Sequence, residues 1–315
     1  MSTTSSNRAG ALESPITDTQ SAPPAKTTTH DPEAHRLPDE PLVTIQPGKS
    51  WGALNLRDIW HYRELLYFLT WRDIKVRYKQ ATLGVAWIVM QPLLSTLVFT
   101  IFLGVLARVP SDGVPYPLFV FAGLMPWTFF ASGVSGSSNS LVGSANLITK
   151  VYFPRMIIPG ASIGARLLDF LISFAVFAGL MLYYGVRPTW GLLWLPVFVA
   201  LLTLLSLAVG MWASAVNVKY RDVGAVLPVL IQFWMFASPV VYPSSLIYSR
   251  GLAPVWQRLY TLNPMVGILD NFRAALLGVP FNWAALAVSV AFTLALLVYA
   301  AYDFRRMERS FADIV

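Results

Sequence analysis

The chain has 315 residues, of which 56% are hydrophobic and only 12% are charged, whereas soluble domains carry about 25% charged residues, so the composition predicts a membrane protein. Its 23 Lys and Arg residues exceed its 16 Asp and Glu residues, and because the basic residues lie beside apolar segments, we expect contacts with anionic lipid headgroups instead of nucleic acid. The absence of Cys excludes disulfides, iron–sulfur clusters, thiolate zinc sites and cysteine nucleophiles.

The first segment, residues 1–50, is rich in Ser, Thr, Pro and Ala and contains no long apolar run. This composition predicts a disordered cytoplasmic tail and no signal peptide. His30 and His35 have acidic neighbours, but a metal site is not expected without a folded scaffold. The PGKS run at 47–50 resembles the end of a phosphate-binding P-loop, yet Val43 stands where that motif needs Gly, so we expect no nucleotide site.

Residues 56–79 are predicted to form an amphipathic helix at the membrane interface. On a helical wheel, the apolar face holds Leu56, Ile59, Trp60, Tyr67, Trp71, Ile74 and Tyr78. The polar face holds Arg57, Asp58, His61, Glu64, Arg72, Lys75 and Lys79. Two roles remain open for this helix: a plain membrane anchor, or a docking surface on which exposed Leu65 and Phe68 meet a cytoplasmic partner.

Six apolar runs with few charged residues follow, and each approaches or exceeds the roughly 20 residues that an α-helix needs to cross a bilayer. They cover residues 82–106, 115–137, 160–184, 190–215, 223–242 and 282–303. The predicted fold class is therefore all-α, a polytopic membrane protein with one transmembrane domain at 51–315. Basic clusters at 72–79, 150–155, 219–221 and 305–309 fall on one side of these spans, which predicts cytoplasmic N- and C-termini.

Ionisable residues are scarce inside the predicted spans. Arg166 and Asp169 lie three residues apart near the cytoplasmic end of the third span, and a helix places them on one face. Charged residues inside a membrane often mark function, but these two can satisfy each other, so we favour a structural pair. The spans do not contain the several carboxylates of a proton or sodium relay.

The segment 243–281 contains apolar pieces too short to cross a membrane. Asn263 and Pro264 predict a helix start, with Asn as the N-cap and Pro at the first helical position. Met265, Ile268, Leu269 and Phe272 then share one side of that helix, with Asp270 and Arg273 elsewhere. The pattern predicts short re-entrant helices that enter the membrane from outside and form a pore mouth.

Many aromatic residues lie near the predicted interfaces. They include Tyr116, Trp127, Trp190, Trp194, Tyr242, Tyr248, Trp256 and Tyr260. Either they form the interfacial belt that is common in membrane proteins, or some of them line a route on which sugar rings stack.

Four ordered segments show a family resemblance. They are Arg72–Gln80 (RDIKVRYKQ) with Leu83-Gly84 and Gln91-Pro92, Asn146–Arg155 (NLITKVYFPR), Tyr220–Asp222, and Leu262–Arg273 (LNPMVGILDNFR). Together with the C-terminal FRRMERSFADIV, they make residues 54–315 resemble the permease subunit of ABC-2-type exporters, which move lipid-linked O-antigen, capsule or teichoic-acid chains. Gly267 stands where the broader ABC-2 pattern often has a polar or basic residue.

The resemblance implies an ABC-2 (type V exporter) fold in the inner, or plasma, membrane. It implies a homodimer with two cytoplasmic ABC ATPase subunits and a polyprenyl-linked polysaccharide as substrate. The chain is then a transport subunit without catalytic residues, metal or cofactor of its own, and ATP and Mg bind to the partner ATPase.

The resemblance also assigns site residues. Coupling to the ATPase is implied for Arg72, Asp73, Asn146, Leu147, Ile148, Lys150, Arg155, Arg221 and Asp222. Within this set we expect residues 146–148 to enter an apolar cleft of the ATPase, with Lys150 and Arg155 paired to acidic residues at its rim. The conduit or outer gate is expected at Gln91, Gln232, Trp234, Trp256, Tyr260, Asn263, Pro264 and Arg273.

Two other functions stay open. One is an ABC-2 permease for a drug, a small lipid or another glycoconjugate. The other is a membrane enzyme acting on polyprenyl-linked sugars, which would need acidic loop residues to bind metal and phosphate. The acidic residues outside the tail are few and mostly adjoin an Arg, which disfavours the enzyme.

Overall fold

The computed structural model describes residues 60–79, 84–151, 153–249, 253–308 and 311. Within these ranges the regular structure is helical and contains no strand, which confirms the all-α class. The predicted tail (1–50), the start of the predicted interfacial helix (56–59) and the first two residues of the first predicted span (82 and 83) lie outside the described residues.

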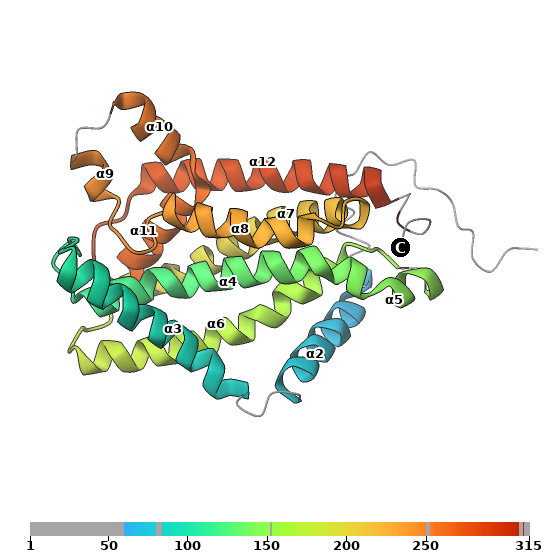
Figure 1. The fold of residues 1–315 in the computed structure, drawn as a ribbon, viewed down its shortest axis with the longest axis horizontal. Coiled ribbons are helices and arrows are strands. Elements are labelled where there is room, and N and C mark those ends of the chain that lie inside the picture. Colours follow the sequence, from blue (N-terminus) through green and yellow to red (C-terminus); the bar gives the residue numbers. More distant parts are fainter. Residues whose placement is uncertain (1–59, 80–83, 152, 250–252, 309–310, 312–315) are drawn as a thin grey trace, which may run out of the picture. The chain divides into compact units, whose positions relative to one another are not determined.

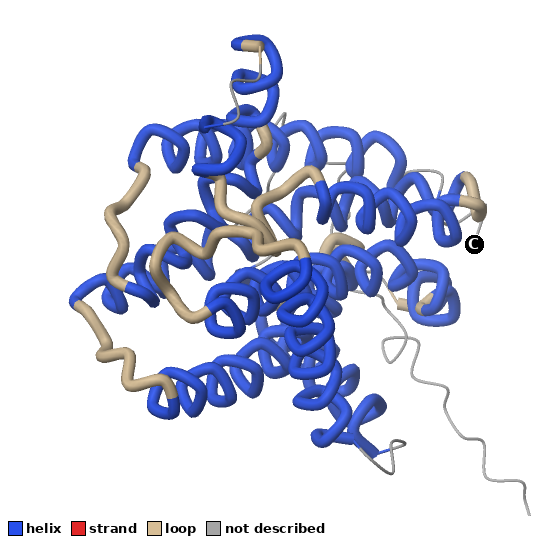
Figure 2. The backbone as a smooth tube through the Cα atoms, turned by 60° about the vertical axis from the view of Figure 1, so that its left-hand side comes forward, coloured by secondary structure: helices blue, strands red, loops and turns tan. Residues whose placement is uncertain are grey.

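The helices follow one another in a simple order (Figures 1 and 2). They are α2 (Arg63–Lys79), α3 (Gly84–Phe99) with the π-helical turn η1 (Thr100–Leu106), α4 (Tyr116–Gly143), α5 (Ala145–Lys150), α6 (Ile157–Tyr183), the 3₁₀ turn η2 (Trp190–Trp194) with α7 (Leu195–Lys219), α8 (Val223–Phe236), α9 (Ser245–Ser249), α10 (Pro254–Leu262), α11 (Pro264–Leu277) and α12 (Trp283–Glu308).

Five of the described helical segments are long and apolar enough to cross a membrane. They are Ala86–Leu106, Tyr116–Gly143, Ile157–Tyr183, Trp190–Lys219 and Trp283–Glu308. They coincide with the first, second, third, fourth and sixth predicted spans, so the chain is a multi-pass membrane protein.

The fifth predicted span is shorter than expected. Helix α8 has 14 residues and ends at Phe236, short of the roughly 20 that a full crossing needs. Pro239 follows, and a residue before Pro is disfavoured in helical geometry, so the helix stops before this point. A sixth crossing therefore stays a prediction.

Helix α4 lies at the centre of the bundle. In the most apolar stretch of α4, 78% of the residues are buried. In the corresponding stretch of the segment that begins at Ala86 in α3, only 11% are buried. Helices α6 and α7 make the most extensive contacts with α4. In Figure 1, α5 lies at one end of these helices and α9 and α10 lie at the other, so the loops fall into two separated sets.

Two hydrophobic clusters hold the bundle together. The larger one runs along α4, α6, α7 and α11 and includes Phe121, Phe130, Phe177, Phe198 and Phe272. The second, here named the loop-end cluster, joins α2, the α5–α6 connection, α7 and the end of α12, and includes Leu69, Ile148, Phe153, Met156, Phe304 and Phe311. Burying such side chains contributes about 2 kcal/mol each, so this cluster fixes the loops at the α5 end to the spans.

The interfacial helix α2 meets the bundle through leucine side chains, a contact that the sequence analysis did not predict. Leu69 is buried, and Leu65, which we expected to be exposed, packs partly against the loop-end cluster. Phe68 is exposed, as expected. Trp60 and Tyr67, from the predicted apolar face, are also exposed in this chain. The leucines turn toward the bundle because α6 supplies an apolar surface there, which the helical wheel of α2 alone could not reveal.

The packing of α11 against α12 explains Gly267. A Cβ atom at this position would lie 2.2 Å from the carbonyl oxygen of Ala285 and 2.4 Å from the Oγ of Ser289. The two helices therefore approach so closely at position 267 that only Gly fits there. A polar or basic side chain is excluded for the same reason.

We predict that Gly267→Ala destabilises the protein by at least about 2 kcal/mol, because the added methyl group overpacks a backbone contact. Gly179 is the matched control, since nothing lies within 4 Å of a Cβ atom there. Gly179→Ala should leave stability unchanged or raise it by up to about 1 kcal/mol. Thermal unfolding in detergent measures both variants, and equal midpoints would contradict the close approach of α11 and α12.

Candidate functional site

The loop between α4 and α6 is anchored and exposed at the same time. Ile148 in α5 is 5% exposed and belongs to the loop-end cluster, and Leu147 packs partly against it. Asn146, Thr149 and Lys150 are exposed on the same short helix. The hydrophobic residues hold α5 to its own chain, which leaves the polar residues available to another molecule.

Arg155, just before α6, is bound within the chain. Its backbone N–H donates to Glu308 Oε1 over 3.2 Å, and its guanidinium donates to the Glu308 backbone carbonyl. The guanidinium carbon also lies 6.0 Å from the centre of the Phe311 ring. These contacts engage one nitrogen of the guanidinium group, and the pairing of Arg155 with acidic residues of a partner stays a prediction.

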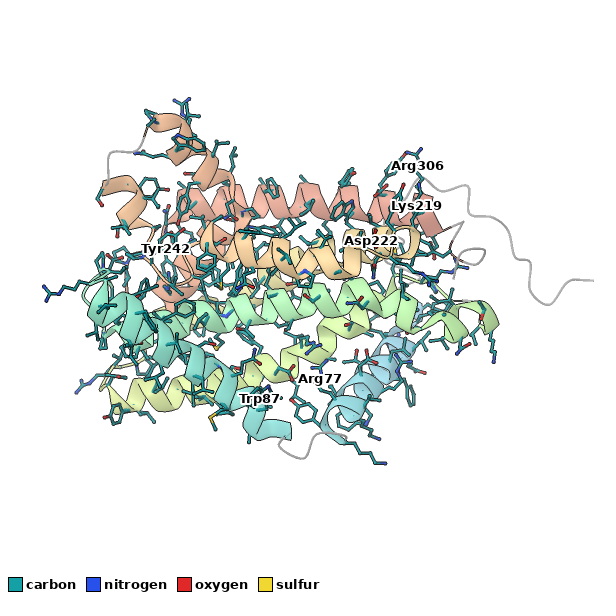
Figure 3. The ribbon with its side chains drawn as sticks, in the orientation of Figure 1. Arg77, Trp87, Lys219, Asp222, Tyr242 and Arg306 are labelled. Atoms are coloured by element: carbon teal, nitrogen blue, oxygen red, sulfur yellow. The ribbon has the colours of Figure 1, made fainter. Side chains whose placement is uncertain are left out.

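The other predicted coupling residues lie on α2 and at the α7–α8 turn. Arg72 and Asp73 form an ion pair of 2.9 Å with each other. Arg221 and Asp222 are exposed at the turn, and Figure 3 shows Asp222 near Lys219 and Arg306 at the α5 end of the molecule.

Asn217 holds this turn in place, a role that the sequence analysis missed. Its Nδ2 donates to the carbonyl of Ser138 over 3.0 Å, and its Oδ1 accepts from the N–H of Gly224 over 3.0 Å. Asn217 thereby links α7 to both α4 and α8. The available signal in the sequence was a polar Asn just after the end of the fourth predicted span.

A charged cluster joins α2 to α6. The predicted pair of Arg166 Nη1 and Asp169 Oδ2 is confirmed at 3.5 Å. Arg77 Nη1 lies closer to the same oxygen, at 2.6 Å, and the Tyr78 hydroxyl donates to Asp169 Oδ1 over 2.8 Å. Burial raises the pKa of Tyr78, so its hydroxyl stays protonated and remains a donor. The predicted pair is thus part of a four-residue cluster.

At the opposite end, Asn263 connects α8 to α11. Its Oδ1 accepts from the backbone N–H of Met265 and from Trp234 Nε1, both over 3.0 Å, which confirms the predicted N-cap. Its Nδ2 donates to Ser238 Oγ over 2.9 Å and to the Ala237 carbonyl over 3.1 Å. Trp234 and Asn263, predicted as separate gate residues, are brought together, and Pro264 is buried beside them.

Arg273 lies inside the protein. It is 4% exposed, its guanidinium carbon lies 3.9 Å from the centre of the Phe119 ring, and one nitrogen donates to the Val240 carbonyl. Such a contact between a cation and an aromatic ring stabilises a desolvated Arg by about 2 kcal/mol. Arg273 therefore holds the loop after α8 against α4 and α11 and does not face outward in this chain.

The remaining gate candidates are more exposed. Trp256 on α10 is 63% exposed, and Tyr260 is partly buried, with its ring 6.3 Å from that of Tyr248. Gln91 on α3 and Gln232 on α8 are both exposed. Aromatic surface is thus available on α10, whereas the two glutamines lie on separate helices.

Comparison with known proteins places this geometry in a family. The sequence pattern of the family described as "ABC-2 type transporter" matches residues 64–277, from α2 to the end of α11. The "O-antigen export system permease protein RfbA" of Myxococcus xanthus is 33% identical over 220 residues, covering 70% of this chain and 82% of that protein. Its namesake from Klebsiella pneumoniae is 26% identical over 253 residues, covering 80% and 95%.

A third relative carries a different name. The "Polysialic acid transport protein KpsM" of Escherichia coli is 27% identical over 239 residues, covering 72% of this chain and 89% of that protein. Each of these alignments covers most of both proteins, and the family pattern spans the α5 loop, the α7–α8 turn and the Asn263 junction. The chain therefore belongs to the ABC-2 type transporter family.

Proposed function

We propose that this chain is the membrane subunit of an ATP-driven exporter that moves a lipid-linked polysaccharide, of the O-antigen, capsule or teichoic-acid type, out of the cytoplasm across the inner membrane. The observation that carries the proposal is the 33% identity to a protein named for O-antigen export, over 82% of that protein's length. Two further relatives named for O-antigen export and polysialic acid transport support the same class of cargo.

ATP hydrolysis belongs to a separate ABC ATPase in this proposal, with two copies on the cytoplasmic face and with ATP and Mg bound there. A force on α5 reaches the spans through Ile148 in the loop-end cluster and through the bond between Arg155 and Glu308. Coupling between subunits requires such contiguous contacts. Exposed Asn146 and Lys150 are the side chains we assign to the ATPase contact.

The conduit lies between two copies of the chain in this proposal. A hydrated glycan cannot enter an apolar layer without a large cost for its unpaired hydroxyls. The centre of the described bundle is filled by α4, in whose most apolar stretch 78% of the residues are buried. The route is therefore assigned to the seam of a homodimer with two-fold symmetry. An exposed apolar face on α8 supports a seam there: Val226, Val229, Leu230, Phe233 and Phe236.

Loss of the chain should trap its cargo. We predict that cells lacking it make the lipid-linked polymer but hold it on the cytoplasmic side, and that the wild-type chain restores surface polymer. Antibody labelling of intact and permeabilised cells measures the two pools. Normal surface polymer in the deletion strain would contradict polysaccharide export and would favour a drug or small lipid as cargo.

Lys150 tests the ATPase contact. We predict that Lys150→Glu weakens copurification of the ATPase and lowers export about tenfold or more, because reversal of an interfacial charge replaces attraction by repulsion. Lys150 is exposed, so the fold should be unaffected. The matched control is Arg187→Glu, an exposed position beyond the other end of α6, which should copurify normally. Equal effects of the two charge reversals would contradict the assignment of α5 to the ATPase contact.

The Cys-free chain permits a direct test of orientation. We propose that the α5 loop and both termini are cytoplasmic and that α9 and α10 are outside. Ser245→Cys on α9 should then react with a membrane-impermeant thiol reagent in intact spheroplasts. Thr149→Cys on α5 should react only after permeabilisation, and both positions are exposed. The reverse labelling pattern would invert the topology.

A further inference from the structure

A pocket of about 380 Å³ lies between α2, α3, α4 and α6. Arg77, Tyr78, Arg166 and Asp169 line one part of it, so the charged cluster that joins α2 to α6 forms its polar wall. Figure 3 places Arg77 and Trp87, which both line the pocket, near the point where α2 and α3 approach each other.

The polar wall carries an excess positive charge. Two guanidinium groups, from Arg77 and Arg166, share the single carboxylate of Asp169, which leaves a net charge of about +1. Both Asp169 oxygens already accept bonds, one from Arg77 and the other from Tyr78. The buried Nε of Arg166 has no hydrogen-bond partner among the described residues. An uncompensated cation with an unused donor is unfavourable at membrane depth, and an anion with acceptor oxygens would relieve both costs.

The rest of the pocket is mostly apolar. Its wall is formed by Trp87, Ile88, Pro92, Met125, Phe129 and Phe170, with the uncharged polar side chains of Gln91, Thr128, Ser132 and Ser173 between them. Trp87 is 57% exposed and belongs to the least buried span, so this side of the pocket lies at the surface of the bundle. A ligand that fits both walls has an anionic oxygen-rich head and a hydrocarbon chain.

We propose that this pocket binds a phosphate-bearing membrane lipid, with the phosphate on Arg166 and Arg77 and the hydrocarbon chain along Phe129 and Phe170. The guanidinium group matches phosphate in shape and charge, and one phosphodiester charge balances the excess charge of the wall. A bilayer phospholipid and a polyprenyl phosphate share this chemistry. The site itself rests on the geometry, and only its use by a carrier lipid rests on the proposed function.

The test uses the purified full-length chain in an uncharged, phosphate-free detergent, with lipid binding followed by native mass spectrometry. The probes are phosphatidylglycerol and undecaprenyl phosphate, each compared with its phosphate-free counterpart, diacylglycerol or undecaprenol. The phosphate lipids should bind the wild-type protein, and the phosphate-free ones should bind at least about tenfold more weakly. Because no ATPase or transport is involved, failure of polysaccharide export would not alter this measurement.

Two substitutions with opposite expected signs separate binding from a structural role. Arg166→Gln should raise the Kd for the phosphate lipids about tenfold, since a charged hydrogen-bonding partner is lost. Asp169→Asn should lower the Kd, because it removes the negative charge that competes with phosphate for the guanidinium groups. The amide oxygen can still accept from the Tyr78 hydroxyl, and Leu69 still holds α2 in the loop-end cluster, so the pocket should persist. The matched control is Lys75→Gln, which removes one positive charge from an exposed position on α2 outside the pocket lining and should leave the Kd unchanged.

Trp87→Ala is a second variant that tests the pocket if Arg166→Gln fails to fold. Because Trp87 is exposed, its loss should weaken binding of the lipid's hydrocarbon chain without unfolding the bundle. The proposal is overturned if phosphate and phosphate-free lipids bind equally, if Arg166→Gln and Asp169→Asn weaken binding together, or if Trp87→Ala and Arg166→Gln both bind as the wild type does. Preference for undecaprenyl phosphate would identify the carrier as the occupant, and equal or tighter binding of phosphatidylglycerol would identify a bilayer lipid.

Discussion

The carboxylate of Asp169 is the interaction on which the position of α2 depends. A carboxylate in an apolar span is unfavourable unless neighbouring donors compensate its charge, and here Arg77, Tyr78 and Arg166 supply them. Two of these donors come from α2, so the interfacial helix is held to α6 by the same contacts that stabilise the charge. The contacts also leave one positive charge over, which makes the pocket beside them suitable for an anionic head.

The second attachment of α2 is apolar and lies nearer its N-terminal end. Leu69 enters the loop-end cluster together with Ile148 from α5 and Phe304 from α12. Because one cluster contains parts of the interfacial helix, the α4–α6 connection and the last span, displacement of any of them disturbs the others. Close packing of this kind transmits strain, as the proposed drive by a separate ATPase requires.

The opposite end of the molecule depends on hydrogen bonds to side chains. Asn263 forms hydrogen bonds with four groups, which come from α8, the following loop and α11. Arg273 donates a hydrogen bond to the Val240 carbonyl in the same loop. Backbone that leaves helical geometry at membrane depth must find such partners inside the protein. The backbone carbonyls of Ala237 and Val240, where the chain leaves helix α8, are paired in this way.

What the sequence determined by itself was local. The long apolar spans, the Asn263 N-cap and the pairing of Arg166 with Asp169 each follow from residues within one helix, where periodicity and spacing decide which side chains meet. The tertiary structure alone decided that Arg77 reaches Asp169 across 92 residues and that Arg155 reaches Glu308 across 153. It also turned Leu65 inward and placed Arg273 in the interior. The physical reason is that hydrogen bonds and ion pairs act over a few ångströms, and helix packing sets which distant residues come that close.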